Sequence, residues 1–167
     1  MSEPKRKLAS APDVTVRPGV EADSAAIAEV VLAAFSQFEH EYTSESFAIV
    51  TPRAETIITR FVEGPIWVAE RDDEIVGTVS LTTEPEGMYI RSMAVHPDAQ
   101  GLGIGHNLLD AVDAYFRSSE LDRIFLYTTY FVPGAKEMYE KHGFKWVRDT
   151  SAEEWYGTPG LEMEKMK

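Results

Sequence analysis

The sequence predicts an α/β domain of the α+β type, built on a mixed sheet with helices on its faces. Two kinds of hydrophobic periodicity alternate along the 167 residues, one typical of strands and one typical of helices. In chain order they read β-α-α-β-β-β-α-β-α-β-β, and strands interrupted by helices in this way favour a single mixed sheet. A glycine-rich turn at residues 100–105 joins one strand to one helix and adds a functional signal to this order.

The N-terminal half begins with a short polar stretch, residues 1–12, which we expect to be a flexible tail ahead of a single domain, residues 13–167. Alternating valines predict a first strand at 13–17, and Asp23 or Ser24 is a suitable cap for the helix that follows. A second helix is expected from about 52 to 62. The apolar positions of these helices are Ile27, Val30, Val31, Ala34, Phe35 and Phe38 in the first, and Ala54, Ile57, Ile58, Phe61 and Val62 in the second.

The C-terminal half contains the remaining strands and two more helices. A charged turn at 71–74 predicts a hairpin between its flanking strands, and Pro133 suits the start of the last helix, which Gly143 ends. The helix after the glycine turn has an apolar stripe of Ile104, Leu108, Val112 and Phe116. The predicted strands are residues 66–70, 75–82, 88–95, 123–129, 144–148 and 161–166.

Composition excludes several classes of protein. The chain has no cysteine, so disulfides, thiolate metal sites and a cysteine nucleophile are excluded. Its four histidines are scattered without metal-ligand spacing, and we expect no metal. A formal charge of −12 disfavours nucleic acid as a partner. No membrane span or signal peptide is visible, so we expect a soluble, cytoplasmic protein with no membrane partner.

The glycine-rich turn predicts an anion site. The first N–H groups of a helix have no internal partner and lie at the positive end of the helix dipole, so they bind phosphate without a lysine. The turn reads Gln100-Gly101-Leu102-Gly103-Ile104-Gly105, which fits Q-x-x-G-x-G. A dinucleotide fingerprint fails, because its third glycine would fall on His106 or Leu108. A P-loop fails as well, because no Gly-Lys-Ser/Thr ends the turn.

A second motif lies downstream, where residues 135–144 read AKEMYEKHGF and fit A-x-x-x-Y-E-K-x-G-F. With Met93-Ala94-Val95 before the glycine turn, the two motifs in this order resemble the GNAT superfamily of acetyl-CoA-dependent N-acetyltransferases. The resemblance covers roughly residues 14–167, and its specific part runs from 88 to 144. It implies the GNAT fold, a mostly antiparallel central sheet of about seven strands with helices on both faces.

The resemblance also implies the donor end of a reaction. Acetyl-CoA would be the acyl donor, with its pyrophosphate on the glycine turn and its pantetheine amides paired to the preceding strand, whose backbone would supply a donor for the acyl oxygen. The residues that would bind the cofactor are Met93, Ala94, Val95, Gln100, Gly101, Leu102, Gly103, Ile104, Gly105, His106 and Ala135. His96 is expected to serve its loop, and the His106 side chain has no assigned role.

Tyr139 inherits the role of the family's tyrosine, which protonates the departing thiolate. Packing against Ala135 and Met138 is its structural alternative. The general base is left open, because Tyr89 stands where many members carry glutamate and because Glu84 and Glu86 are also readable as turn charges. A second departure is Val132-Pro133, where relatives often have an asparagine that contacts the cofactor.

The acceptor would be a small-molecule amine or a peptide amine, attacking the thioester directly through a tetrahedral intermediate. The expected acceptor residues are Phe38, Glu39, His40, Tyr42, Tyr89 and Trp155, where carboxylates beside aromatics suit an ammonium. A solvated loop with packing aromatics is the competing interpretation of these residues. The alternatives to an acetyltransferase are a catalytically silent acyl-CoA-binding sensor module and a transferase of longer acyl chains. Many relatives are dimers, so the resemblance also allows a homodimer.

Overall fold

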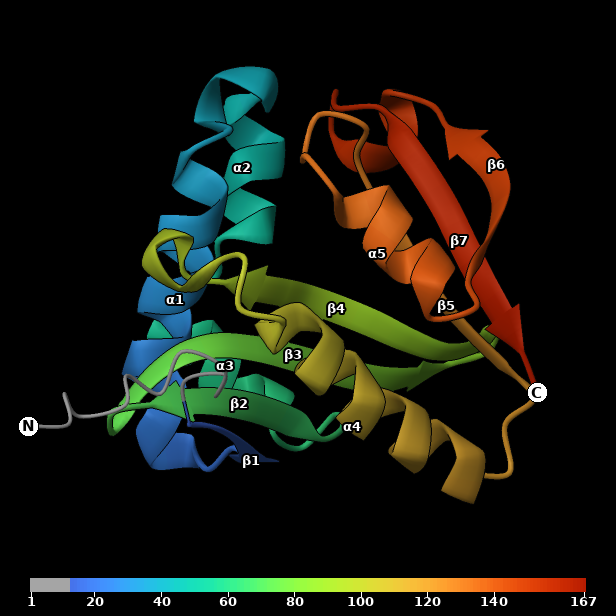
Figure 1. Cartoon of the computed structure of the whole chain (residues 1–167). Coiled ribbons are helices and arrows are strands. Elements are labelled where there is room, and N and C mark those ends of the chain that lie inside the picture. The colour runs from blue at the N-terminus through green and yellow to red at the C-terminus, as the bar shows by residue number, and fades with distance from the viewer. Residues whose placement is uncertain (1–12) are drawn as a thin grey trace, which may run out of the picture.

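The computed structural model describes residues 13–167, and the expected tail at 1–12 lies outside them. Along these residues seven strands and five helices form one α/β layer structure (Figure 1). No helix in 13–167 is both long and apolar enough to cross a membrane. The elements are β1 Val14–Pro18, α1 Ser24–Ser36, α2 Ser44–Val50, α3 Ala54–Arg60, β2 Ile66–Arg71, β3 Glu74–Glu84, β4 Gly87–Val95, α4 Ile104–Ser118, β5 Arg123–Thr128, α5 Ala135–Lys141, β6 Lys145–Thr150 and β7 Gly160–Met166.

The seven strands form one sheet in the order β1-β2-β3-β4-β5-β7-β6. Every neighbouring pair is antiparallel except β4 and β5, which run parallel. The expected mixed, mostly antiparallel sheet is therefore confirmed. The parallel pair is also the shortest, with only three residue pairs from Met88↔Ile124 to Ile90↔Leu126. Beyond these pairs the two strands separate, and the sheet opens at its centre (Figure 1).

Helices cover both faces of the sheet because its inner strands carry apolar side chains on both sides, as β2 does with Val68 on one face and Ala69 on the other. One buried cluster joins α1 and α3 to β2, and it includes Val31, Ile57 and Val68. A larger cluster joins α4 and α5 to the other face, and it includes Leu108 and Tyr139. Gly77 of β3 permits the close packing of α4, because a Cβ there would lie 2.9 Å from Ile104 Cγ2.

The structure corrects the expected element order at one place. Three helices, not two, precede β2, because residues 44–50 form α2. Thr43 caps this helix by accepting a hydrogen bond from the Ser46 N–H, at 3.1 Å. Only Ser46 of α2 is fully buried, and a helix of 7 residues is too short to show the repeated apolar spacing by which longer helices are recognised in sequence. Phe38, placed on the first helix by its spacing, lies beyond its end at Ser36.

Candidate active site

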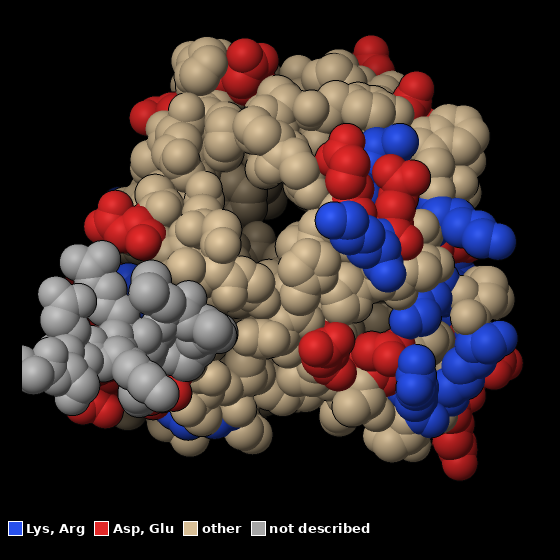
Figure 2. Space-filling view, in the orientation of Figure 1, with Lys and Arg blue, Asp and Glu red and all other residues tan. Residues whose placement is uncertain are grey.

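The separation of β4 from β5 produces a cavity of about 940 Å³ that passes through the centre of the sheet. This volume lies in the range of small-molecule sites, which is roughly 300–1,000 Å³. On the molecular surface the cavity opens as a hollow between the α1–α2 side and the α5 side (Figure 2). The residues beyond the last β4–β5 pair, such as Ser92, Met93 and Thr128, line it.

A β-bulge in β4 shapes the floor of the cavity. Between the pairs Thr78↔Ala94 and Ser80↔Arg91, one residue of β3 lies opposite two residues of β4, Ser92 and Met93. Ser92 adopts a left-handed conformation with φ 57°, which is rare for a residue other than glycine. Strain of this kind costs of order 1–3 kcal/mol and concentrates at functional sites. The bulge also takes backbone groups out of the regular β3 ladder at the cavity.

The glycine turn lies at one end of the cavity and has the geometry of an anion site. Gly101 and Gly103 have φ of 82° and 78°, and Gly103 caps the N-terminus of α4. A Cβ on either glycine would meet no protein atom within 4 Å, so open space lies in front of both. Gln100 fixes the turn to the preceding strand, since its Nε2 donates to the Val95 carbonyl at 3.2 Å. The unpaired N–H groups of the first turn of α4 therefore lie next to open space, where an anion could bind.

Gly105 has a different role from the two turn glycines. A Cβ there would lie 2.7 Å from Met138 Sδ, so its missing side chain lets α5 pack against the first turn of α4. Of the predicted cofactor residues, only Leu102 is absent from the cavity wall, and its side chain packs against the core. Those that line the cavity are Met93, Ala94, Val95, Gln100, Gly101, Gly103, Ile104, Gly105, His106 and Ala135.

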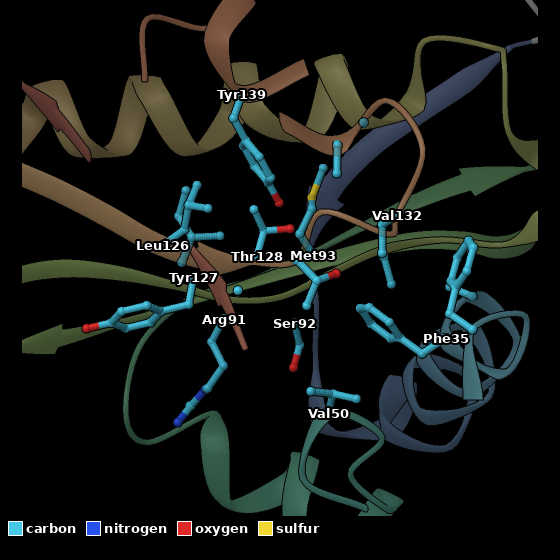
Figure 3. Close-up of a pocket in the computed structure, with 18 of the residues that line it drawn as sticks. Phe35, Val50, Arg91, Ser92, Met93, Leu126, Tyr127, Thr128, Val132 and Tyr139 are labelled. Atoms are coloured by element: carbon cyan, nitrogen blue, oxygen red, sulfur yellow. The ribbon is translucent and has the colours of Figure 1, made fainter. Parts of the chain in front are cut away.

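Tyr139 extends from α5 into the cavity between the two separated strands, with its hydroxyl toward Thr128 and Met93 (Figure 3). The residue is only 6% exposed, and its ring packs edge-on against Phe144 with centroids 5.8 Å apart. Burial raises the pKa of the phenol far above its usual value of about 10. Tyr139 therefore remains a protonated donor throughout the neutral pH range.

His106 and His142 link the glycine turn to the end of α5. Nδ1 of His106 lies 2.8 Å from Nε2 of His142, and their rings stack with centroids 4.9 Å apart. Burial, and next the proximity of His106, lowers the pKa of His142. Asp110 and Asp113 oppose this shift and Lys165 adds to it. His96, in contrast, serves its own loop, because its Nδ1 accepts from the Asp98 N–H at 3.1 Å.

We expect His142 to make the folded state sensitive to mild acid. Its pKa is lower in the folded chain than in the unfolded chain, so the unfolded chain binds the proton more readily. Its contribution to stability is therefore present above the unfolded pKa of about 6.5 and is lost as pH falls below that value. Urea unfolding at pH 7.5 and 5.5 should show a smaller drop for His142→Gln than for the unchanged chain. Equal drops would rule out this contribution.

The other end of the cavity is walled mainly by aromatic side chains. Tyr42 packs against Phe131 with ring centroids 4.9 Å apart, and Tyr89 stacks on Phe125 at 5.2 Å. Burial raises the pKa of both tyrosines to about 12, so both stay neutral. Of the expected acceptor residues, Phe38, Tyr42, Tyr89 and Trp155 line the cavity, whereas Glu39 and His40 do not.

Two arginines at this end were not singled out from the sequence. Arg60, the last residue of α3, donates from Nη1 to Ser92 Oγ at 2.8 Å, and Arg91 of β4 pairs with Glu63 at 2.7 Å. Both arginines line the cavity. Glu154 is the only carboxylate among the described lining residues, and it pairs with Arg148 at 2.7 Å. The one sequence signal that could have indicated them was Arg91 itself, a charged residue within the largely apolar strand that also contains Tyr89.

Comparison with known proteins identifies relatives for most of the chain. The model of the acetyltransferase (GNAT) family matches residues 29–144. A protein named "IAA acetyltransferase" of Azospirillum brasilense is 32% identical over 79 residues, which are 46% of this chain and 52% of that protein. An amino-acid acetyltransferase of Mycobacterium tuberculosis is 33% identical over 88 residues, which are 50% of this chain and 48% of that protein. The chain thus matches about half the length of these curated relatives.

Solved structures share the fold over nearly the whole chain. The PaiA N-acetyltransferase of Thermoplasma acidophilum, solved in complex with coenzyme A, has a TM-score of 0.78 at 19% sequence identity. The match covers 93% of this chain and 99% of that structure. At this identity the likeness establishes the fold.

Proposed function

This chain belongs to the acetyltransferase (GNAT) family, and we propose that it is an acyltransferase that moves an acetyl group from acetyl-CoA to a primary amine. The observation that carries the proposal is the set of residues that line one cavity. Its wall includes the glycine turn at the start of α4, the bulged end of β4 and Tyr139. These are the groups needed to hold a pyrophosphate, an acyl thioester and a leaving thiolate.

The residues of the cavity suit coenzyme A. The open space before Gly101 and Gly103 leaves the first N–H groups of α4 free for a pyrophosphate. The C-terminal part of β4, which no longer pairs with β5, has backbone groups that could hydrogen-bond to the amides of pantetheine, as if the ligand were an added strand. The complex of the Thermoplasma protein with coenzyme A supports this placement by analogy of fold. Lys136 of α5 is less suited to contact a phosphate of coenzyme A, because its Nζ pairs with Glu140 at 3.4 Å.

The proposed chemistry is direct transfer. The amine nitrogen attacks the thioester carbonyl, a C–N bond forms, and the tetrahedral intermediate expels the thiolate as the C–S bond breaks. The Tyr139 phenol gives its proton to that sulfur and regains one from the nitrogen, through solvent if needed. The products are an amide and CoA thiol. No activated nucleophile is needed on the protein, and the chain has no cysteine to supply one.

The proton acceptor for an incoming ammonium is not assigned to a carboxylate. Glu84 and Glu86 are absent from the cavity wall, and Glu154 is held by Arg148 and the Ser151 N–H. Tyr89, at the position where glutamate is common, stays neutral because burial raises its pKa to about 12, and its ring stacks on Phe125. This feature favours the second candidate, an acyl-CoA-binding sensor without turnover. An amine that arrives already neutral needs no such base.

Two measurements on the same protein test the proposal. CoA at 100 times its Kd should stabilise the fold by about 2.7 kcal/mol, and a thermal shift detects this. Thiol release from acetyl-CoA and from butyryl-CoA, against a panel of amines, detects transfer. Binding without thiol release across the panel would favour the sensor, and faster release from butyryl-CoA would favour a longer acyl chain. Absence of a thermal shift with saturating CoA would exclude all three.

A further inference from the structure

Arg60 carries a half-buried positive charge, and Glu63, the carboxylate that favours this charge, is itself paired with Arg91. The only hydrogen-bond partner of its guanidinium within residues 13–167 is the hydroxyl of Ser92, at 2.8 Å, and none of the ion pairs in that range includes Arg60. Burial, and next the charge of Arg91, lowers the pKa of Arg60 to about 10. The guanidinium is still charged at neutral pH, in an environment that disfavours the charge.

Arg91 adds a second guanidinium to the same end of the cavity. One of its nitrogens, Nη2, pairs with Glu63, which is partly exposed, at 2.7 Å. Its Nε is buried and has no hydrogen-bond partner among the described residues. The two arginines thus share one nearby carboxylate, Glu63. Ser92, which has a strained backbone and accepts the hydrogen bond from Arg60, follows Arg91 on β4. This arrangement stands out in a chain whose formal charge is −12.

A partly paired guanidinium cluster is costly to bury unless an anion completes it. Guanidinium groups bind carboxylates with parallel N–H···O bonds, which fixes the orientation of the bound group. Around the cluster the wall is apolar or aromatic, with Phe35, Tyr42 and Val50 lining the cavity. The ligand that fits this end therefore has a negatively charged group attached to an apolar body.

We propose that the acceptor amine also carries a carboxylate, as an amino acid with an apolar or aromatic side chain does, and that Arg60, Ser92 and Arg91 bind this carboxylate. Figure 3 shows Tyr139 entering the cavity from one side and Arg91 and Ser92 pointing away from it on the other. An acceptor held by its carboxylate at the arginines would direct its amine toward Tyr139. The inference rests on the proposed acetyl transfer and specifies the acceptor.

The test compares acceptors that differ only at the carboxylate. Thiol release from acetyl-CoA is measured with apolar and aromatic amino acids, with their carboxamides and with the matching aminoalkyl phosphonates. For the best acceptor, kcat/KM should be at least about 30-fold higher for the acid than for its carboxamide. In Arg60→Gln this acid-to-amide ratio should fall toward about one, chiefly through the KM of the acid.

Arg117→Gln is the matched control, because Arg117 is exposed on α4 and pairs with Asp113 outside the cavity. It should keep the acid-to-amide ratio of the unchanged chain. Thermal midpoints of both variants verify that they are folded. If carboxamides or simple amines react as well as acids, or if Arg60→Gln lowers both rates equally, the inference is wrong while acetyl transfer stands. Preference for phosphonates overturns the carboxylate assignment. Absence of thiol release with every amine overturns the proposed function itself.

Discussion

Replacement of Tyr139 by phenylalanine is expected to lower kcat by about 100-fold, at the lower end of what general acid catalysis contributes. The substitution removes only the hydroxyl that faces the cavity. The ring, which packs against Phe144, stays in place, so the fold and the cofactor turn should be undisturbed. CoA affinity, measured by calorimetry, should change by no more than about threefold.

Tyr115→Phe is the control for the loss of a tyrosine hydroxyl. Tyr115 lies on α4, packs against Trp67 and does not line the cavity. Single-turnover rates should be compared, because a slow product release hides a change in the chemical step. Unchanged single-turnover rates in Tyr139→Phe would remove Tyr139 from the mechanism. Because burial raises the Tyr139 pKa, its ionisation should cause no loss of kcat up to about pH 9.

The geometry of the glycine turn, the proposed donor end of the site, could be predicted from the sequence because its determinants are local. A turn of six residues, 100–105, contains both the glycines that adopt positive φ and the start of the helix at which we propose that the pyrophosphate binds. The amphipathic pattern of α4 is equally local, so its position was predicted closely. Tyr139 was found through its own motif, and the structure brings it to the same cavity.

The proposed acceptor end could not be predicted in the same way, because it is assembled from distant residues. Arg60 and Ser92 are 32 positions apart in the sequence. Their contact depends on a β-bulge in β4, and no residue in that strand is of a type that predicts a bulge. The expectation of carboxylates at this end followed from the acidic segments near residues 39–41 and 153–154. Of these, only Glu154 lines the cavity, and Arg148 neutralises it. The pattern of charge along the chain did not indicate the sign of charge in the cleft.

Gly103→Val is expected to weaken CoA binding by more than tenfold. Gly103 has φ 78°, a conformation that a β-branched residue adopts only with difficulty, and the new side chain would fill the space before the α4 N-terminus. Two effects follow, a loss of stability of about 1–2 kcal/mol from the backbone and a loss of affinity from the obstructed N–H groups. Calorimetry with CoA and urea unfolding measure them separately.

Gly143→Val separates these two effects. Gly143 also has positive φ, at 90°, and follows the end of α5, but it does not line the cavity. Valine there should cost similar stability and leave the Kd for CoA within about threefold. A large loss of affinity in Gly103→Val alone therefore locates the pyrophosphate at the turn, because backbone strain is common to both variants. Equal losses of affinity would mean that a loosened fold, not the turn, controls cofactor binding.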